Sequence, residues 1–320
     1  MLHDLGPQLV TVFGGSGFIG RYVVRRLARA GHRVRVAIRR PDEGLFLKPF
    51  GAVGQIDLVQ ANVRDDASVA RAVAGADAVI NLVGILYEGS RQTFDAVQAE
   101  GAGRIARAAA AAGVARLIHV SAIGAAAESP SDYARAKAEG EAAVRDAFPK
   151  ATILRPSVVF GAEDDFFNRF GRMARFSPFL PLIGGGQTRF QPVFVDDVAG
   201  AVFNALTRED AAGRTYELGG PKVYTFEEIM KLVLETTCRR RALVPVPFFA
   251  AKLLGSVLSF LPVPPLTRDQ VLLLERDNIV DPAAPGLADL GVAPTPAEAI
   301  LETYLARYRR GGTKVAARFS

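Results

Sequence analysis

Short apolar runs alternate along the first half of the chain with segments rich in alanine and arginine. The apolar runs are predicted strands, at residues 9–13, 33–38, 55–60, 77–83, 115–121 and 151–155. The segments between them are predicted helices, at residues 17–30, 66–74, 94–112 and 132–147. Several runs are continuously apolar, as expected for strands covered by helices on both faces. The alternation therefore predicts an α/β fold built on a Rossmann-type, doubly wound parallel sheet.

The regular alternation ends near residue 160, where a segment rich in phenylalanine and proline begins and continues to about residue 192. Further proline clusters follow at 245–247 and 262–265. We predict that residues 1–160 form a dinucleotide-binding domain to which residues 190–220 return. Residues 161–189 and 221–320 are predicted to form a smaller, irregular C-terminal α/β domain.

Composition limits the classes of site that the chain can hold. The single cysteine, Cys238, excludes an internal disulfide, and with only three histidines we predict no metal site. No basic segment followed by a long apolar stretch precedes the first run, so we expect no targeting peptide and no transmembrane segment. The net charge of +6 permits attraction to anionic lipid, to nucleic acid or to an acidic protein without choosing between them.

A glycine-rich loop follows the first predicted strand in the stretch VFGGSGFIG, residues 12–20. Glycines at this spacing, between a strand and a helix, let backbone N–H groups and the helix dipole meet a pyrophosphate at close range. The alternative is a tight turn without a ligand. We predict that the loop binds a dinucleotide through Gly14, Ser16, Gly17, Phe18, Ile19 and Gly20.

Two arginines, Arg39 and Arg40, follow the second predicted strand, where an NAD-specific protein would place an acidic residue. Guanidinium groups can pair with the 2′-phosphate of the adenosine ribose. These residues therefore favour NADPH over NADH, unless one or both side chains simply point into solvent.

Further motifs resemble those of the extended and atypical short-chain dehydrogenase/reductase families. Asn62 and Val63 lie in a stretch similar to the adenine-side motif after the third strand, and Leu82, Val83 and Gly84 in one similar to the motif that closes the fourth. The family motif Tyr-x-x-x-Lys is matched by Tyr133 and Lys137, and its Arg-Pro-x-x-x-Tyr-Gly segment by residues 155–161. The resemblance implies that the following residues also contact the cofactor: Asn62, Val63, Leu82, Val83, Gly84, Tyr133, Lys137, Pro156 and Val159.

One helical turn separates Tyr133 from Lys137, so both side chains lie on one helix face and the ammonium can lower the pKa of the phenol. The resemblance implies a catalytic set of Ser121, Tyr133 and Lys137. The chain departs from extended family members after Ser121, since alanines occupy the place of their usual hydroxyl residues. An active dyad and a pair retained only to anchor the cofactor therefore both remain open. We interpret His119 as a packed or capping residue.

Other segments resemble the nucleotide-binding accessory subunit of respiratory complex I, and the similarity extends from about residue 9 to residue 304. They are residues 137–141, 146–149, 163–170, 190–198, 266–271 and 285–291. The resemblance implies a subunit without independent catalysis that holds NADPH and supports the assembly and stability of the peripheral arm. Its partners would be other complex I subunits at the junction of the peripheral and membrane arms, with no nucleic acid partner. In the bacterial form it would lie on the cytoplasmic face of the inner membrane as a peripheral protein.

Two features of the second half fit a docking role. Residues 248–261 are apolar on nearly all sides, and residues 304–318 combine basic and aromatic side chains suited to an anionic lipid surface. The alternatives are a helix buried in the smaller domain and an ordinary solvated tail. Two other functions also stay open: an NADPH-dependent reductase or sugar-nucleotide epimerase, and an NADPH-sensing regulatory protein.

Overall fold

The computed structural model describes residues 8–89, 92–261 and 264–311. The end of the predicted basic tail, residues 312–320, lies outside the described residues, as do residues 1–7. The chain forms two compact units, each assembled from several segments. Unit 1 contains the described residues of Met1–Pro156, Val195–Leu218 and Pro282–Ala293, and unit 2 those of Ser157–Phe194, Gly219–Asp281 and Pro294–Ser320.

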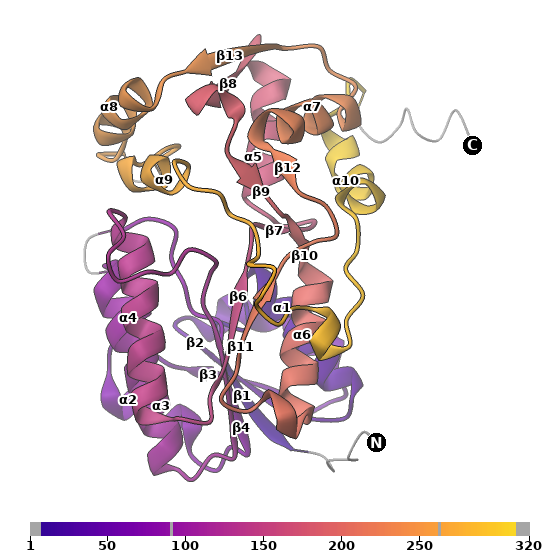
Figure 1. Ribbon diagram of the computed structural model, residues 1–320. Helices are drawn as coiled ribbons and strands as arrows, with labels where there is room; N and C mark the ends of the chain where they lie inside the picture. Colours follow the sequence, from indigo (N-terminus) through magenta and orange to yellow (C-terminus); the bar gives the residue numbers. More distant parts are fainter. Residues whose placement is uncertain (1–7, 90–91, 262–263, 312–320) are drawn as a thin grey trace. The chain divides into compact units, whose positions relative to one another are not determined.

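A seven-stranded parallel sheet forms the centre of unit 1, in the order β11-β6-β5-β4-β1-β2-β3 (Figure 1). Its strands are β1 (Leu9–Phe13), β2 (Arg33–Ile38), β3 (Ile56–Gln60), β4 (Ala78–Asn81), β5 (Arg116–Val120), β6 (Thr152–Pro156) and β11 (Thr215–Leu218). The direction of winding reverses at β1, which has β2 on one side and β4 on the other. Sheets of this kind bind ligands beyond the carboxyl ends of the strands at the point of reversal. The predicted doubly wound parallel sheet is confirmed.

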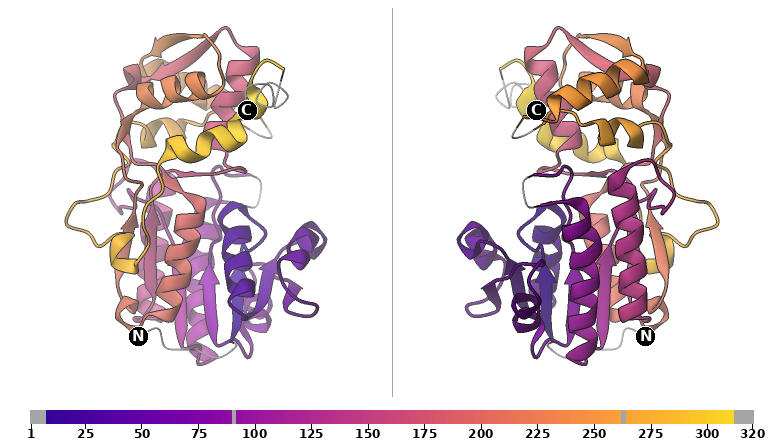
Figure 2. Two further views of the ribbon diagram at one scale, coloured as in Figure 1. Left: turned by 90° about the vertical axis from the view of Figure 1, so that its right-hand side faces the viewer. Right: turned by 90° about the vertical axis from the view of Figure 1, so that its left-hand side faces the viewer.

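Helices cover both faces of this sheet (Figures 1 and 2). On one face lie α1 (Phe18–Arg29) and α6 (Val195–Thr207), and on the other α2 (Asp66–Val73), α3 (Glu100–Ala111) and α4 (Asp132–Ala147). The six predicted strands and four predicted helices are all present, with ends close to the predicted ones. The predicted helix 94–112 differs in one respect, because it opens with a π-helical turn, η2 (Asp95–Ala99).

Small residues let the elements on the second face pack closely. A Cβ at Gly140 of α4 would lie 2.2 Å from the carbonyl oxygen of Gln98 in η2, so only glycine permits this approach. The core beside it is made of fully buried aliphatic side chains that include Val69, Ile105 and Val144. This packing fixes the position of α4 on the sheet.

Unit 2 consists of helices and short strand pairs. Its helices are α5 (Phe166–Phe176), α7 (Phe226–Thr236), α8 (Phe248–Leu258), α9 (Arg268–Leu273) and α10 (Ala297–Leu305), with a 3-10 turn η6 (Ala306–Tyr308). The strand pairs join β7 (Val159–Phe160) to β10 (Val193–Phe194), β9 (Arg189–Phe190) to β12 (Tyr224–Thr225), and β8 (Phe179–Ile183) to β13 (Ala242–Val246). Aromatic rings fill its core, and they include Phe160, Phe166, Phe167, Phe190 and Phe226.

A buried carboxylate, Asp164, ties α5 to α10. It accepts hydrogen bonds from the backbone N–H groups of Gly161 and Asn168, at 3.1 and 3.0 Å, and from the hydroxyl of Tyr304. Burial raises the pKa of Asp164, and these donors oppose that shift. Asp164, one of three acidic residues in the segment 163–170, is therefore part of the structural support of unit 2.

The helix α8 is largely exposed, and among its residues only Ala251 and Gly255 are buried. Of the alternatives for residues 248–261, a helix buried in the smaller domain is therefore wrong. In the described ranges no helix combines the length and the apolar character needed to cross a membrane.

Candidate dinucleotide-binding site

The glycine loop lies between β1 and α1, at the point where the sheet reverses its winding. Gly14 has a φ of +75°, which side chains rarely allow, and its N–H donates to the carbonyl oxygen of Ala37 in β2 at 3.2 Å. A Cβ at Gly20 would lie 2.3 Å from the carbonyl oxygen of Gly14. Glycine at these two positions holds the first turn of α1 directly against the end of β1.

The N-terminus of α1 is open to an anion. Gly17 is its N-cap residue and provides no side-chain cap, and the first turn has no acidic residue. The backbone N–H groups of Ser16, Phe18 and Ile19 belong to the loop and first turn, where helix N–H groups lack partners within the helix. The partial positive charge of the helix end adds to them. A pyrophosphate group fits this donor set.

The two arginines predicted to read the 2′-phosphate follow β2 directly, and they differ in their partners. The Nη1 atom of Arg39 donates to the side-chain oxygen of Gln92 at 2.5 Å, a neutral partner. The Nη1 atom of Arg40 pairs with the carboxylate of Glu43 at 2.7 Å. Both arginines are exposed. Arg39 is therefore the side chain whose charge is free of a carboxylate.

The loops after β3 and β4 are held by side-chain caps. Asn62 accepts a hydrogen bond from the N–H of Arg64 at 3.1 Å, and the carbonyl oxygen of Val63 accepts one from Arg104 at 2.8 Å. Asn81, the last residue of β4, accepts one from the N–H of Val83 at 3.1 Å.

The loop after β4 reaches the glycine loop. The N–H of Leu82 donates to the carbonyl oxygen of Phe13 at 3.0 Å, and a Cβ at Gly14 would lie 3.2 Å from the carbonyl carbon of Leu82. Residues 82–84 thus line the same sheet edge as the glycine loop.

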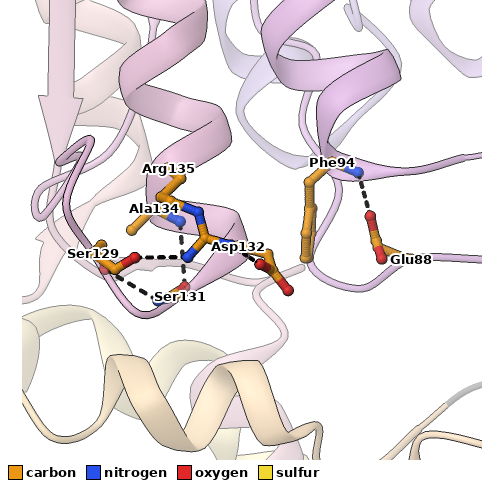
Figure 3. A network of polar contacts seen from close by, with 7 residues as sticks. All are labelled: Glu88, Phe94, Ser129, Ser131, Asp132, Ala134 and Arg135. Atoms are coloured by element: carbon orange, nitrogen blue, oxygen red, sulfur yellow. Dashed lines mark hydrogen bonds and ion pairs between the residues drawn. The ribbon is translucent and has the colours of Figure 1, made fainter.

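The helix α4 carries Tyr133 and Lys137, and polar contacts fix its first turn (Figure 3). The Ser131 hydroxyl caps the helix by accepting from the N–H of Ala134 at 3.3 Å, and Arg135 binds both the Ser129 carbonyl oxygen and Asp132. Nearby, the Glu88 carboxylate accepts from the N–H of Phe94 at 2.7 Å.

The ring of Phe94 packs edge-on against Tyr133, with the centroids 5.6 Å apart. The phenol is thus placed by a well-braced helix start and by an aromatic neighbour.

Lys137 is buried at the carboxyl end of β5, and its Nζ atom lies 3.4 Å from the carbonyl oxygen of Val120. It also lies 5.8 Å from the centroid of the Tyr133 ring. Burial lowers the pKa of Lys137 to about 8, although the nearby carboxylate of Glu141 opposes the shift. An ammonium group in this state can donate a hydrogen bond to a ribose hydroxyl or release its proton near neutral pH.

Buried polar atoms without a partner in the described part of the chain occur on three residues that surround this region: Gln98, His119 and Ser121. The Ser121 hydroxyl follows β5 directly. The Oε1 atom of Gln98 and the Nζ atom of Lys137 each lie 3.5 Å from the position of a Cβ on Gly84. Because native proteins rarely leave such atoms unsatisfied, they mark a place where a bound molecule or water completes the structure.

His119 is neutral and held in one tautomer. Burial lowers its pKa to about 3, helped by the charge of Lys137. Since the Oδ1 atom of Asn81 accepts from Val83, its amide nitrogen donates to the Nδ1 atom of His119 at 3.1 Å. The proton of His119 therefore resides on Nε2, which is a buried donor without an acceptor in the described residues.

The remaining residues of the predicted site are divided between the units. Pro156 ends β6 in unit 1, where its carbonyl oxygen accepts from the N–H of Ile123 at 3.0 Å. Val159 lies in β7 of unit 2, paired with β10. Arg155, which belongs to the same motif, forms a bidentate ion pair with the buried carboxylate of Glu141, at 2.8 and 2.7 Å.

The sequence prediction did not include Gln98. A signal was available, because Gln98 lies on the apolar stripe of its helix, in line with Ala102, Ile105 and Ala109. A polar residue on such a stripe needs a partner, and the π-helical turn around it is a feature that is frequent at functional sites.

Comparison with known proteins agrees with this geometry. Residues 10–219 match the model of the NAD dependent epimerase/dehydratase family. The chain belongs to this family.

It is also 38% identical over 316 residues to NADH dehydrogenase [ubiquinone] 1 alpha subcomplex subunit 9, mitochondrial, from Arabidopsis thaliana, covering 95% of this chain and 79% of that protein. It is 33% identical over 241 residues to the ceramide reductase of Caulobacter vibrioides, covering 75% of this chain and 74% of the relative. The subunit-9 proteins are therefore relatives of this chain along nearly its whole length.

A solved structure shows the same fold. DesIV, a dTDP-glucose 4,6-dehydratase from Streptomyces venezuelae solved with NAD and TYD bound, superposes with a TM-score of 0.73 at 21% identity, covering 94% of this chain and 96% of that one. In that protein the shared fold holds NAD.

Proposed function

We propose that this chain is an accessory subunit of respiratory complex I that holds NADP(H) as a structural or regulatory cofactor and supports the peripheral arm. The observation that carries the proposal is the 38% identity to a protein named as a complex I subunit over 95% of this chain. This match includes the second half, beyond the residues 10–219 that the broader family model covers.

In this proposal the glycine loop and the N-terminus of α1 bind the pyrophosphate, and Asn62 and Val63 line the adenine side. Arg39 binds the 2′-phosphate, with Arg40 as a second cation once it leaves Glu43. This arrangement favours NADPH over NADH because only NADPH carries the phosphate.

On the nicotinamide side, Lys137 donates to the ribose hydroxyls, and Tyr133, Ser121 and Gln98 supply further polar groups. The loop of residues 82–84 and Pro156 provide the backbone wall. These residues bind and orient the cofactor, and turnover of a substrate is not required of them.

The proposed partners are other complex I subunits at the junction of the peripheral and membrane arms, together with an anionic lipid surface. In a bacterial cell the subunit lies on the cytoplasmic face of the inner membrane as a peripheral protein. The basic net charge of +6 suits both an acidic subunit and an anionic membrane.

The test is to isolate the complex from membranes of the native cell and to extract its bound nucleotide. We expect this chain to co-purify with NADH:quinone oxidoreductase activity and the extract to contain NADP(H). Gly17→Trp places a bulky side chain at the pyrophosphate, so it should deplete the subunit from the complex. A chain absent from the purified complex, or an extract with only NAD(H), contradicts the proposal.

A second candidate is a reductase, favoured by the lowered pKa of Lys137, by the partnerless hydroxyl of Ser121, and by the ceramide reductase relative. In that case Tyr133 is the acid that protonates a carbonyl oxygen. Tyr133→Phe keeps most of the packing against Phe94 but removes that proton. Loss of an NADPH-dependent reduction in this variant, with assembly intact, favours the reductase. Normal NADH:quinone turnover by the assembled complex favours the accessory subunit.

A further inference from the structure

After Phe248, which packs against the core of unit 2, the helix α8 exposes most of its large apolar side chains and buries only the small residues Ala251 and Gly255. A Cβ at Gly255 would lie 2.8 Å from the backbone nitrogen of Arg268, so the small side of the helix rests directly on the start of α9. Phe249 is 76% exposed and Phe260 is 92% exposed. The apolar face of α8 and the residues directly after it consists of Phe249, Leu253, Leu254, Val257, Phe260 and Leu261.

This apolar face carries no charge and offers no hydrogen bond. The one charged residue in the segment 248–261 is Lys252, which pairs with Glu275 at 2.7 Å. The hydroxyls of Ser256 and Ser259 donate back to carbonyl oxygens of the same helix, at 2.9 and 2.6 Å. Single exposed apolar residues are ordinary on a protein surface, but a contiguous face of this kind marks an interaction site.

An arginine cluster adjoins the start of β13, the strand that leads to α8. The Nε atom of Arg241 donates to the carbonyl oxygen of Ala174 in the last turn of α5 at 2.8 Å, and that of Arg239 to the carbonyl oxygen of Tyr308 at 2.7 Å. Helix C-termini attract cations, so these contacts anchor each guanidinium by one edge. The full arginine cluster comprises Arg175, Arg239, Arg240, Arg241 and Arg310.

The charges of the arginine cluster are not neutralised within the described residues, where no carboxylate lies at ion-pair distance from any of the five. The pKa of Arg239 is lowered mainly by burial, and the charges of Arg241, Arg310 and Arg175 lower it further. Arg239, Arg240 and Arg241 line a cleft of about 590 Å³ together with Lys231 and one carboxylate, Glu235, so cations outnumber anions along its wall. The mutual repulsion of these cations is relieved when an anion binds among them.

The apolar face and the arginine cluster are joined by one short strand. The strand β13 begins directly after Arg241, and α8 begins two residues after β13 ends. Figure 1 shows α8, β13 and β8 together at one end of unit 2. Two exposed rings lie beside the cluster: Phe179, in β8, is the neighbour of the first residue of β13, and Phe176 lies under the guanidinium of Arg175 at 5.3 Å.

We propose that the apolar face and the arginine cluster form one docking surface for an anionic lipid bilayer. A protein partner forms about one hydrogen bond per 100–200 Å² of interface, and the apolar face presents no group to make one. The hydrocarbon edge of a bilayer requires none. The arginines at the other end of β13, which have no carboxylate partner in the described residues, match anionic headgroups. This inference rests on the peripheral-membrane part of the proposed function and names the surface responsible.

The first experiment measures binding of the purified full chain to vesicles by co-sedimentation. Vesicles of phosphatidylcholine alone are compared with vesicles that also contain anionic phosphatidylglycerol. We expect binding to the anionic vesicles that weakens as salt is added, because salt screens the arginines. Absence of binding to the anionic vesicles at low salt overturns the inference, whereas co-purification with complex I is tested separately and does not depend on it.

Two triple variants then locate the surface. The apolar variant carries Leu253→Ser, Leu254→Ser and Val257→Ser, and its matched control carries Leu45→Ser, Leu86→Ser and Val53→Ser, which change equally exposed apolar residues of unit 1. The charge variant carries Arg175→Gln, Arg240→Gln and Arg310→Gln. Its control carries Arg29→Gln, Arg33→Gln and Arg71→Gln, exposed arginines without an ion pair in the described residues.

The charge variant should bind anionic vesicles on the order of a hundredfold more weakly, since each arginine near the surface contributes about one kcal/mol, while its control retains most of the affinity. The apolar variant should lose binding at the salt concentration where its control still binds. Equal losses in a variant and its control overturn the inference, because they would assign the binding to overall composition. A concentration-dependent dimer that the apolar variant abolishes also overturns it, because a second copy would then cover the apolar face.

Discussion

Replacing Arg39 by glutamine is expected to weaken NADPH binding roughly 10- to 100-fold and to leave NADH binding nearly unchanged. A hydrogen bond to a charged group contributes about 1.5–3 kcal/mol, and every 1.4 kcal/mol is a factor of about ten in the dissociation constant. Arg39 contacts the neutral side chain of Gln92 at 2.5 Å, so it gives up a hydrogen bond to an uncharged acceptor, and no ion pair, when it turns to a phosphate. Most of the gain from the charged contact is therefore kept.

Arg40→Gln should have a smaller effect, because Arg40 is already paired with Glu43 at 2.7 Å. The two side chains are 72% and 59% exposed, so the pair itself is worth no more than about 1 kcal/mol. Glu43→Gln should accordingly strengthen NADPH binding by a few fold, since it frees Arg40 and removes a negative charge near the phosphate.

Titration calorimetry with NADPH and NADH on each variant measures these effects. Arg33→Gln is the matched control, because it removes an equally exposed arginine at the opposite end of β2. An equal loss of affinity for both nucleotides in Arg39→Gln would refute the reasoning, since the phosphate is the only group in which they differ there. Equal effects of Arg39→Gln and Arg40→Gln would refute the assigned difference in their partners.

Three further predictions, which use four variants, test the site by urea unfolding of the free chain. Gly20→Ala should lower the free energy of unfolding by about 1–3 kcal/mol, because its Cβ would lie 2.3 Å from the Gly14 carbonyl oxygen. Gly17→Ala should lower it clearly less, because the nearest atom to its Cβ is 3.2 Å away. Equal losses in the two variants would contradict the geometry. Lys137 has a pKa of about 8 in the folded chain against 10.5 when exposed, so the free-energy cost of burying its charge is complete below pH 8 and disappears as the pH rises to 10.5. The free energy of unfolding of the wild type should therefore rise by up to about 3 kcal/mol over that range relative to Lys137→Met. Parallel pH profiles of the two proteins would exclude the pKa shift. Gln98→Met removes an amide that has no partner in the described residues, so it should raise the stability of the free chain by about 1 kcal/mol. It should also reduce the extra stability that NADPH provides. A loss of stability in the free chain would show that the amide is already hydrogen-bonded.

The sheet and its helices could be predicted from the sequence because their signals are local. A parallel strand covered on both faces is a continuous apolar run, and the helices between such runs have their own periodicity. The glycine loop could also be predicted from the sequence, because local backbone geometry requires glycine at Gly14 and Gly20, which are six residues apart. The bounds of β1 and α4 match the prediction for the same reason.

The surroundings of Lys137 could not be read in this way, because they depend on contacts between distant segments. Gln98 reaches the region only because Gly140 lets α4 pack against the carbonyl oxygen of Gln98 itself. The tautomer of His119 depends on Asn81, which is 38 residues away in sequence and adjacent only through the pairing of β4 with β5. No periodicity in the sequence encodes either contact.

The orientation of α8 was a third feature beyond the sequence. Residues 248–261 are apolar on nearly all sides, so their pattern does not say which side faces the core. The choice is made by Ala251 and Gly255, whose small size allows α9 to approach closely. The same apolar pattern fits a buried helix equally well. Beyond Phe248, only the small residues of α8 fit against α9, and most of the large side chains therefore face outward.

The partnerless atoms around Lys137 bear on whether the nucleotide is structural. Each buried polar atom left unsatisfied costs about 1–3 kcal/mol, and Ser121, His119 and Gln98 contribute four such atoms. A bound molecule that satisfies two of these atoms would recover a few kcal/mol of stability. This is comparable to the stabilisation by a tightly bound ligand, which is about 4 kcal/mol when the free ligand is a thousandfold above its dissociation constant. If the nucleotide of the proposed function supplies these contacts, the empty chain is less stable than the occupied one, and the nucleotide then supports folding as well as any chemistry. Such a structural role requires no proton transfer by Tyr133.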